Sequence, residues 1–280
     1  MSTDAAALPQ PTTAEGRAGL QALLAEPARA LVALDFDGTL APVVSRPEDA
    51  RPAAGAVDAL RDLAAVVGTV AVITGRPVET VLALSGLDGV PGLEGLVVLG
   101  HYGLERWDGA SGRVVSPEPA PGVERARRAL PGLLRDAPAG VTVEDKHHSV
   151  VVHTRQSERP DATLAALTPA LRRLAEETGL EGVPGRRVLE LRPPGVDKGG
   201  ALRALAAERT PSAVLFAGDD LGDLPAYEAV ATLRCEGLPG VTVASASDEV
   251  QELAQRADLV VDGPPGVVGL LRALTGVVEG

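Results

Sequence analysis

The chain has 280 residues, a formal net charge of −12 and a composition in which 45% of the residues are hydrophobic but only 2% are aromatic. This length allows one large domain, or a core domain that carries a smaller insertion. The negative charge argues against nucleic acid or an anionic membrane surface as the main partner, because both select clustered Lys and Arg. A core with few aromatics must be built from Val, Leu and Ala, which suits a buried parallel sheet between helices.

The amino-terminal stretch is expected to form a tail followed by a helix. Residues 1–14 are rich in Ala, Pro and Thr, which favours a loose tail, and helical spacing begins at Glu15. The stretch lacks a basic start followed by an apolar run, and no later apolar run is long enough to span a membrane. We therefore expect a cytoplasmic protein without a membrane partner, in which residues 1–28 form this tail and helix.

Helix and strand signals alternate in two parts of the chain. In the first part the expected elements are a strand over 31–34, a helix over 52–67, a strand over 69–73, a helix after Pro77 and a strand over 96–99. The rhythm returns around Leu191 with a helix from Lys198, a strand over 213–217, a helix past Leu221 and strands near 241–244 and 259–261. Strand, helix and strand at about 30-residue spacing is the pattern of a parallel sheet. We predict an α/β fold whose core, residues 29–105 and 189–280, is a Rossmann-like parallel sheet with helices on both faces.

The middle of the chain breaks this rhythm. It contains a hairpin-like segment, a helix over 123–135, β-rich runs over 141–144 and 149–153, and a helix over 161–177. We predict that residues 106–188 form a separate α+β cap domain inserted into the core.

The strongest chemical signal is the segment Asp35-Phe-Asp37-Gly38-Thr39, which follows the first strand. Two carboxylates at the carboxyl end of a buried strand face the crevice where open α/β sheets bind ligands. Like charges so close repel each other, and Mg²⁺, which prefers few carboxylates together with water and phosphate oxygens, would relieve that repulsion. The alternative is an ordinary Asp-Gly turn.

Three other strand ends carry polar residues that suit a phosphate. These residues are Thr74, Lys198 and the group Asp219, Asp220 and Asp223. Each has an ordinary alternative, since Thr74 could cap a helix, the aspartates could complement a helix dipole and Lys198 could be a solvated charge. Their joint occurrence at strand ends favours a phosphate site.

Together these segments resemble the four motifs of the haloacid dehalogenase (HAD) phosphatases, over roughly residues 29–275. The resemblance implies that Asp35 attacks phosphorus, that Asp37 serves as acid and base, and that Thr74 and Lys198 hold the phosphate. It also implies a magnesium ion bound by Asp35, by Asp37 through its backbone carbonyl, and by Asp219. Asp220 and Asp223 would lie around that metal without binding it directly.

Within that superfamily the chain looks most like the trehalose 6-phosphate phosphatases. The supporting segments are Ile73-Thr-Gly-Arg76-Pro, Gly100-His-Tyr-Gly-Leu-Glu105, Glu144-Asp-Lys146, His153-Thr-Arg155 and Leu189-Glu190-Leu-Arg-Pro193. The resemblance implies that the substrate-binding residues are Arg76, His101, Glu105, Lys146, His153 and Glu190. The chain departs from the family at His101-Tyr102, where Asn-His is usual, and at Gly222 and Leu224, which flank Asp223 in place of Thr and Glu.

The function that this resemblance implies is removal of phosphate from trehalose 6-phosphate, with a functional link to a trehalose-phosphate synthase. A phosphatase for another sugar phosphate, such as sucrose phosphate or mannosyl-phosphoglycerate, is the nearest alternative. A non-catalytic regulatory module is a further one, although it predicts loss of the nucleophile or of a metal-binding acid. A phosphomutase would need a way to return the phosphoryl group, and nothing in the chain specifies one.

Overall fold

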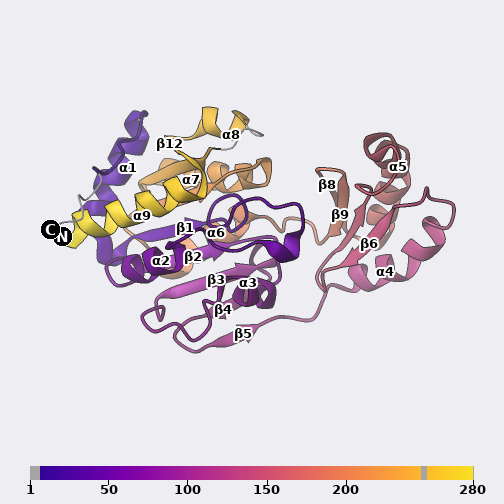
Figure 1. The fold of residues 1–280 in the computed structure, drawn as a ribbon, viewed down its shortest axis with the longest axis horizontal. Helices are drawn as coiled ribbons and strands as arrows, with labels where there is room; N and C mark the ends of the chain where they lie inside the picture. Colours follow the sequence, from indigo (N-terminus) through magenta and orange to yellow (C-terminus); the bar gives the residue numbers. More distant parts are fainter. Residues whose placement is uncertain (1–6, 247–250, 280) are drawn as a thin grey trace. The chain divides into compact units, whose positions relative to one another are not determined.

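The computed structural model describes residues 7–246 and 251–279, which form two compact units. The core unit comprises Met1–Ser116 and Asp197–Gly280, and the cap unit comprises Pro117–Val196. Figure 1 shows the ribbon of both units in sequence colours. None of the helices in the described ranges combines the length and the apolarity that crossing a bilayer requires.

The core unit is built on an eight-stranded sheet with the order β12-β11-β10-β1-β2-β3-β4-β5. The pairs from β12 to β3 are all parallel, whereas β4 and β5 are antiparallel additions at one edge. The strands are β1 (Leu31–Leu34), β2 (Thr69–Ile73), β3 (Leu96–Gly100), β4 (Glu105–Asp108), β5 (Arg113–Val115), β10 (Val214–Gly218), β11 (Gly240–Ser245) and β12 (Leu259–Val261). The carboxyl ends of the six parallel strands therefore meet along one edge of the sheet.

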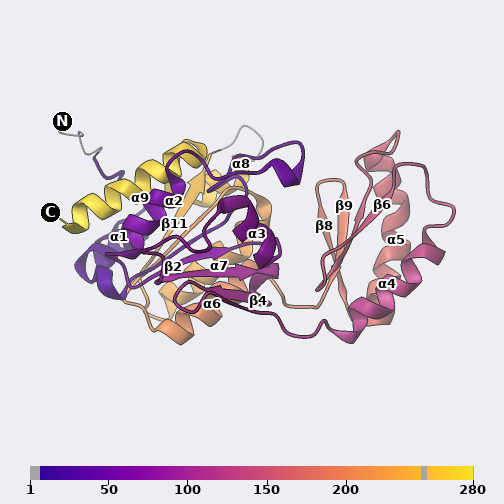
Figure 2. The same ribbon diagram turned by 60° about the horizontal axis from the view of Figure 1, so that its bottom comes forward.

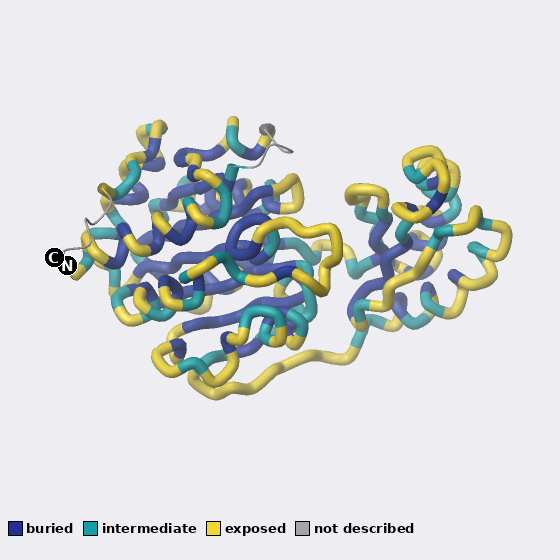
Figure 3. Tube along the Cα trace, viewed as in Figure 1, coloured by how far each residue is buried: buried dark blue, intermediate teal, exposed yellow. Residues whose placement is uncertain are grey.

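Helices cover both faces of this sheet (Figure 1). Alternate side chains of β1 enter opposite layers: Val32 and Leu34 pack into one and Leu31 and Ala33 into the other. The first layer contains α1 (Ala14–Ala25), α2 (Ala56–Ala64), α3 (Val78–Ser85) and α9 (Gly263–Glu279). The second contains α6 (Lys198–Arg209), α7 (Leu224–Cys235) and α8 (Gln251–Arg256). Figure 3 shows the resulting burial of the central strands, and the predicted α/β fold with a parallel-sheet core is confirmed.

The cap unit consists of an antiparallel sheet with two helices on one face (Figure 2). Its strand order is β6-β7-β9-β8, with β6 (Thr142–Asp145), β7 (Val150–His153), β8 (Glu181–Gly185) and β9 (Val188–Arg192). Its helices are α4 (Pro121–Leu133) and α5 (Pro160–Thr178). Val150, Val152, Leu189 and Leu191 pack against these helices, so the residues between them in sequence lie on the other face of the sheet.

The division between the units differs from the predicted cap boundaries of 106 and 188. The hairpin β4–β5 extends the core sheet because β4 pairs with β3 and Trp107, which is 2% exposed, packs in the core. At the other end β9 pairs with β7 and β8, so residues 189–196 belong to the cap unit. An antiparallel hairpin breaks the strand–helix alternation without leaving the sheet, which is why the rhythm placed the first boundary too early.

The amino-terminal stretch is only partly the loose tail that its composition predicts. Residues 1–6 of that prediction lie outside the described residues. The Thr12 backbone N–H donates a 2.7 Å hydrogen bond to the Asp258 carbonyl, and Thr13 caps α1 by accepting from the Gly16 backbone N–H. The first of these contacts joins the residue just before the α1 cap to Asp258, which precedes β12. Four short 3₁₀ turns complete the described elements: η1 (Pro27–Arg29), η2 (Pro47–Asp49), η3 (His101–Gly103) and η4 (Leu221–Asp223).

Candidate active site

Lys198 forms the centre of a buried charge cluster at the carboxyl edge of the core sheet. Its ammonium nitrogen Nζ lies 2.8 Å from Asp35 Oδ1 and 2.7 Å from Asp223 Oδ1. Asp35 directly follows β1, and Lys198 opens α6, whose first turn is capped by the Asp197 side chain. Burial alone would lower the pKa of Lys198, but Asp223 and Asp35 raise it well above its usual range. Lys198 is therefore a buried cation and is not the solvated surface charge that was the alternative.

The three aspartates that follow β10 have different structural roles. Asp223 Oδ2 accepts hydrogen bonds from the backbone N–H groups of Asp219 and Asp220, at 2.9 and 3.2 Å. Asp220 caps the η4 turn by accepting a 2.8 Å hydrogen bond from the Gly222 N–H. Asp219 is 6% exposed, and its Oδ1 atom has no hydrogen-bond partner among the described residues. A buried oxygen without a partner among the described residues is available to a ligand or an ion.

Close approach of two loops creates this arrangement. Gly38 has φ of +74°, and a Cβ atom at its position would lie 1.9 Å from Asp219 Oδ2. Only glycine therefore allows the loop after Asp35 to turn against Asp219. Ser245, at the end of β11, donates a 2.7 Å hydrogen bond to the Gly38 carbonyl and holds the same loop. Ser245 was not among the residues predicted from the sequence, although it is a polar residue at a strand end.

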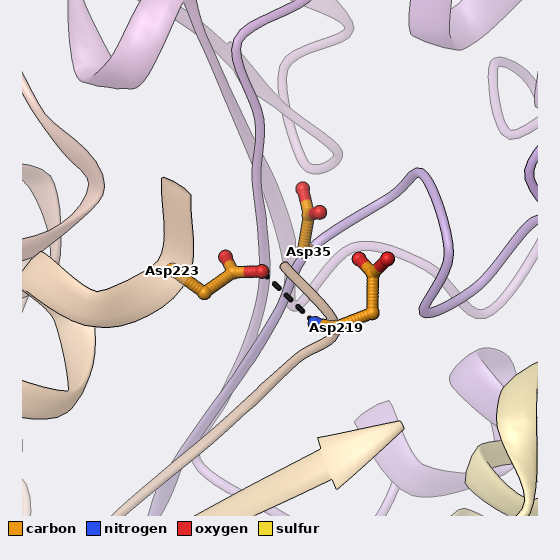
Figure 4. Close-up of side chains that lie close together, drawn as sticks. All are labelled: Asp35, Asp219 and Asp223. Carbon is orange, nitrogen blue, oxygen red and sulfur yellow. Dashed lines mark hydrogen bonds between the residues drawn. The ribbon is translucent and has the colours of Figure 1, made fainter. Parts of the chain in front are cut away.

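Asp35, Asp219 and Asp223 bring carboxylate oxygens within 4.8 Å of one another (Figure 4). Burial raises the pKa of Asp35 well above its usual range, and Lys198 opposes this rise. Burial also raises the pKa of Asp219 to about 8, with further rises from Asp223 and Asp220. A hard divalent cation would relieve the repulsion, and the unpartnered Asp219 oxygen offers it a ligand. The donor set therefore fits Mg²⁺. Both oxygens of Asp223 already accept hydrogen bonds, from Lys198 and from the backbone, so Asp35 and Asp219 are the carboxylates best placed to bind the ion.

The carboxylate of Asp37 engages Arg76. Arg76 Nε lies 2.6 Å from Asp37 Oδ2 and Arg76 Nη2 lies 2.7 Å from Asp37 Oδ1, so the pair is bidentate. The Asp37 side chain is 38% exposed and that of Arg76 is 16% exposed. Arg76, which the family resemblance implies is a substrate-binding residue, thus contacts the residue expected to act as acid and base.

Thr74 directly follows β2 and is 1% exposed. Its hydroxyl oxygen accepts a 3.2 Å hydrogen bond from the Arg76 backbone N–H. It does not cap α3, because Pro77 precedes that helix without a side-chain cap and Glu105 instead accepts a 2.8 Å hydrogen bond from the Val78 N–H. Thr74 therefore lies in the loop that follows β2, at the same sheet edge as Asp35.

His101 and Glu105 are buried parts of the core unit, at 2% and 7% exposure. Glu105 caps α3 through one oxygen and accepts a hydrogen bond from the Ser116 hydroxyl at 3.1 Å through the other. His101 Nε2 lies 3.9 Å from Glu105 Oε1. Glu105 therefore caps α3. A sugar contact for His101 and Glu105 stays a prediction.

The three remaining predicted substrate residues belong to the cap unit. Glu190 is 7% exposed on β9 and accepts a 2.6 Å hydrogen bond from the Ser149 hydroxyl. Lys146 Nζ lies 4.0 Å from the same Glu190 oxygen, Oε1. His153 on β7 contacts Glu144, with 2.8 Å between Nε2 and Oε2. The strand register places Glu190 opposite Val151 and hence on the same sheet face as His153, the face away from α4 and α5. Ser149 and Glu144 were not among the predicted residues.

Comparison with known proteins identifies relatives of most of the chain. A family model described as "Trehalose-phosphatase" matches residues 33–263. The chain is 37% identical over 212 residues to an uncharacterised glycosyl hydrolase of Mycobacterium tuberculosis. The aligned region covers 72% of this chain and 15% of that protein. It is 33% identical over 247 residues to a trehalose-phosphate phosphatase of Mycobacterium marinum. This aligned region covers 85% of this chain and 60% of that protein. The chain thus spans only part of either curated relative.

Two solved structures share the fold. The C-terminal domain of a Candida albicans trehalose-6-phosphate phosphatase has a TM-score of 0.74 and 20% identity, with 96% of this chain and 99% of that chain covered. A trehalose-6-phosphate phosphatase related protein has a TM-score of 0.67 and 24% identity, with 89% and 100% covered. At these identities the structural likeness concerns the fold alone.

Proposed function

Because the chain belongs to the trehalose-phosphatase family, we propose that it is a phosphomonoester hydrolase that converts trehalose 6-phosphate to trehalose and phosphate. The observation that carries this proposal is the buried Lys198, which joins Asp35 and Asp223 beside the unpartnered oxygen of Asp219. A cation next to a carboxylate nucleophile offers a phosphate group both an attacking atom and a counter-charge. A cytoplasmic location and a functional link to a synthase that supplies the substrate belong to the same proposal.

In the proposed first step an Asp35 carboxylate oxygen attacks the phosphorus in line. A bond forms between that oxygen and phosphorus, and the bond from phosphorus to the sugar oxygen breaks. The Asp37 carboxyl donates its proton to the departing oxygen, so the sugar leaves as an alcohol. Thr74 and Lys198 hold the phosphoryl oxygens during the transfer, because charge persists on them in a loose transition state.

In the proposed second step a water molecule attacks the phosphorus of the aspartyl-phosphate. The Asp37 carboxylate takes a proton from that water, and the bond between phosphorus and the Asp35 oxygen breaks. Inorganic phosphate leaves, Asp35 is again a carboxylate and Asp37 is again protonated. Both proton transfers therefore require the Asp37 carboxyl group at the same position beside the reacting phosphorus.

Asp35, the backbone carbonyl of Asp37 and Asp219 are the groups that would hold Mg²⁺. When bound, the ion would offset the repulsion between the anionic nucleophile and the anionic phosphate. Asp223 would not bind the ion itself. Its carboxylate accepts hydrogen bonds from Lys198 and from the Asp219 backbone N–H, and so orients both groups.

Sugar recognition is assigned to Lys146, His153 and Glu190 of the cap unit. A disaccharide offers many hydroxyls and little apolar surface, so it is recognised by convergent polar groups on a rigid sheet. The shared sheet face of Glu190 and His153, together with the 4.0 Å approach of Lys146 to Glu190, provides such a group.

The test is phosphate release from a panel of sugar phosphates, including trehalose 6-phosphate, sucrose phosphate and mannosyl-phosphoglycerate, by the wild-type chain and by Asp35→Asn. We expect the highest kcat/KM with trehalose 6-phosphate. Asp35→Asn should retain the fold, checked by circular dichroism, and lose turnover, because Asn is nearly isosteric but a poor nucleophile. Full turnover by Asp35→Asn would remove the nucleophile from the proposal, and preference for another sugar would reassign the substrate.

A further inference from the structure

We propose that Arg76 is a positioning residue that acts through Asp37, holding its carboxylate in the place that both proton transfers require. This inference rests on the proposed function, since it takes Asp37 as the acid and base. It gives Arg76 a role different from the substrate binding that the family resemblance implies.

The contact between the two side chains fixes the Asp37 carboxylate in both position and plane. The two N–H···O contacts measure 2.6 and 2.7 Å and use both carboxylate oxygens. A guanidinium bonded in this fork geometry restricts rotation of the carboxylate, which a single ammonium contact would leave free. The guanidinium carbon also lies 5.9 Å from the centroid of the Phe36 ring, which flanks it.

Arg76 is itself held at its backbone. Its N–H donates to the Thr74 hydroxyl at 3.2 Å, and its carbonyl accepts from the His101 N–H at 2.9 Å. The neighbouring Tyr102 N–H donates to the Thr74 carbonyl at 2.9 Å. His101 and Tyr102 both have left-handed φ angles, +47° and +57°. Such a conformation costs free energy in non-glycine residues and persists where surrounding contacts enforce it. The turn after β3 thus anchors the loop from which Arg76 reaches Asp37.

The charge distribution explains why Asp37 needs this partner. Asp35, Asp219 and Asp223 form the crowded acidic group, and the carboxylate of Asp37 is not part of it. The positive charges beside that group, Lys198 and a bound metal ion, would attract the Asp37 carboxylate as well. Arg76 supplies a competing positive charge that holds this carboxylate apart from them, in one fixed position.

The experiment compares Arg76→Ala, Arg76→Lys, Asp37→Asn and the double variant Arg76→Ala/Asp37→Asn, in Mg²⁺ and with two substrates. With trehalose 6-phosphate, Arg76→Ala should lower kcat by up to about a hundredfold, the loss typical of a misplaced catalytic group, while KM changes little. With p-nitrophenyl phosphate, whose leaving group needs no proton, the rapid burst of p-nitrophenol should persist and only the following steady-state rate should fall. Arg76→Lys should restore part of the loss. Arg61→Ala is the control, because Arg61 forms an exposed pair with Asp58 and should leave all rates unchanged.

The decisive measurement is the double variant. If Arg76 acts through Asp37, adding Arg76→Ala to Asp37→Asn should change the rates by less than about twofold, since coupled residues are not additive. Additive losses, or a rise in KM of equal size for both substrates, would overturn the inference and make Arg76 a direct phosphate ligand. The burst with p-nitrophenyl phosphate involves no sugar, so it tests Arg76 even if the panel assigns a different substrate.

Discussion

Lys198 Nζ lies 2.7 Å from Asp223 Oδ1, and the exposure of the two side chains is 6% and 0%. Removing one member of a buried ion pair leaves the other charge without compensation, at a cost of about 3–5 kcal/mol. Here Lys198 also offsets Asp35, so its loss leaves three carboxylates close together. The pair therefore links the stability of the core unit to the chemistry proposed for it.

The first prediction follows from that pair. In metal-free buffer, Lys198→Met should lower the free energy of unfolding by about 3–5 kcal/mol, measured by urea titration. Added Mg²⁺ should recover part of this loss, because a second cation can serve the same carboxylates. The control is Lys146→Met, since Lys146 and Lys198 are the only lysines of the sequence and Lys146 is in the cap unit. A Lys198→Met protein as stable as wild type would show that the pair contributes no stability.

The second prediction concerns pH. Burial raises the pKa of Asp219 to about 8 in the absence of metal, whereas an unfolded Asp titrates near 4. Between these values the folded state binds the extra proton, so stability should decrease as pH rises from about 4 to 8, by at most about 1.4 kcal/mol per pH unit for one proton.

Thermal unfolding in chelator across this pH range measures the effect. Asp219→Asn should weaken the dependence, because an amide does not titrate, while Asp35 and Asp223, whose pKa values burial also raises, keep contributing to it. Mg²⁺ should stabilise the wild-type protein most at the high-pH end, where its carboxylate ligands are ionised. A metal-free protein whose stability rises through this window would contradict the assignment of the raised pKa to Asp219.

The third prediction concerns the cap. Lys146→Ala and His153→Ala should each lower kcat/KM for trehalose 6-phosphate by roughly ten- to a hundredfold, the effect of losing one hydrogen bond to a charged group. Ser149→Ala should produce a smaller loss of the same kind, because its hydroxyl orients Glu190.

All three variants should retain their rates with p-nitrophenyl phosphate, which offers no sugar hydroxyls. Ser157→Ala is the matched control for Ser149→Ala, since Ser157 is also a buried cap serine but donates to the Thr154 backbone carbonyl. Equal losses on both substrates would mean that these residues support the fold or the chemistry, and the assignment of sugar recognition would be dropped.

The sequence by itself determined the local features of this protein. The run over 69–73 predicted β2 with its observed bounds, because a short apolar segment between polar residues is readable without tertiary contacts. The same logic placed Asp35, Thr74 and Asp219 just after strands whose carboxyl ends meet at one edge of the sheet. It also recognised a change of architecture in the middle of the chain.

Only the tertiary structure decided which of these groups touch. Asp37 and Arg76 are 39 residues apart, and Lys198 and Asp223 are 25 apart, so no periodicity relates them. The hairpin β4–β5 belongs to the core because β3 offers it an edge, and Glu105 becomes a helix cap because the start of α3 lies within its reach. Local propensity acts over a few residues, whereas pairing of buried charges depends on distances that only the assembled sheet and helices set.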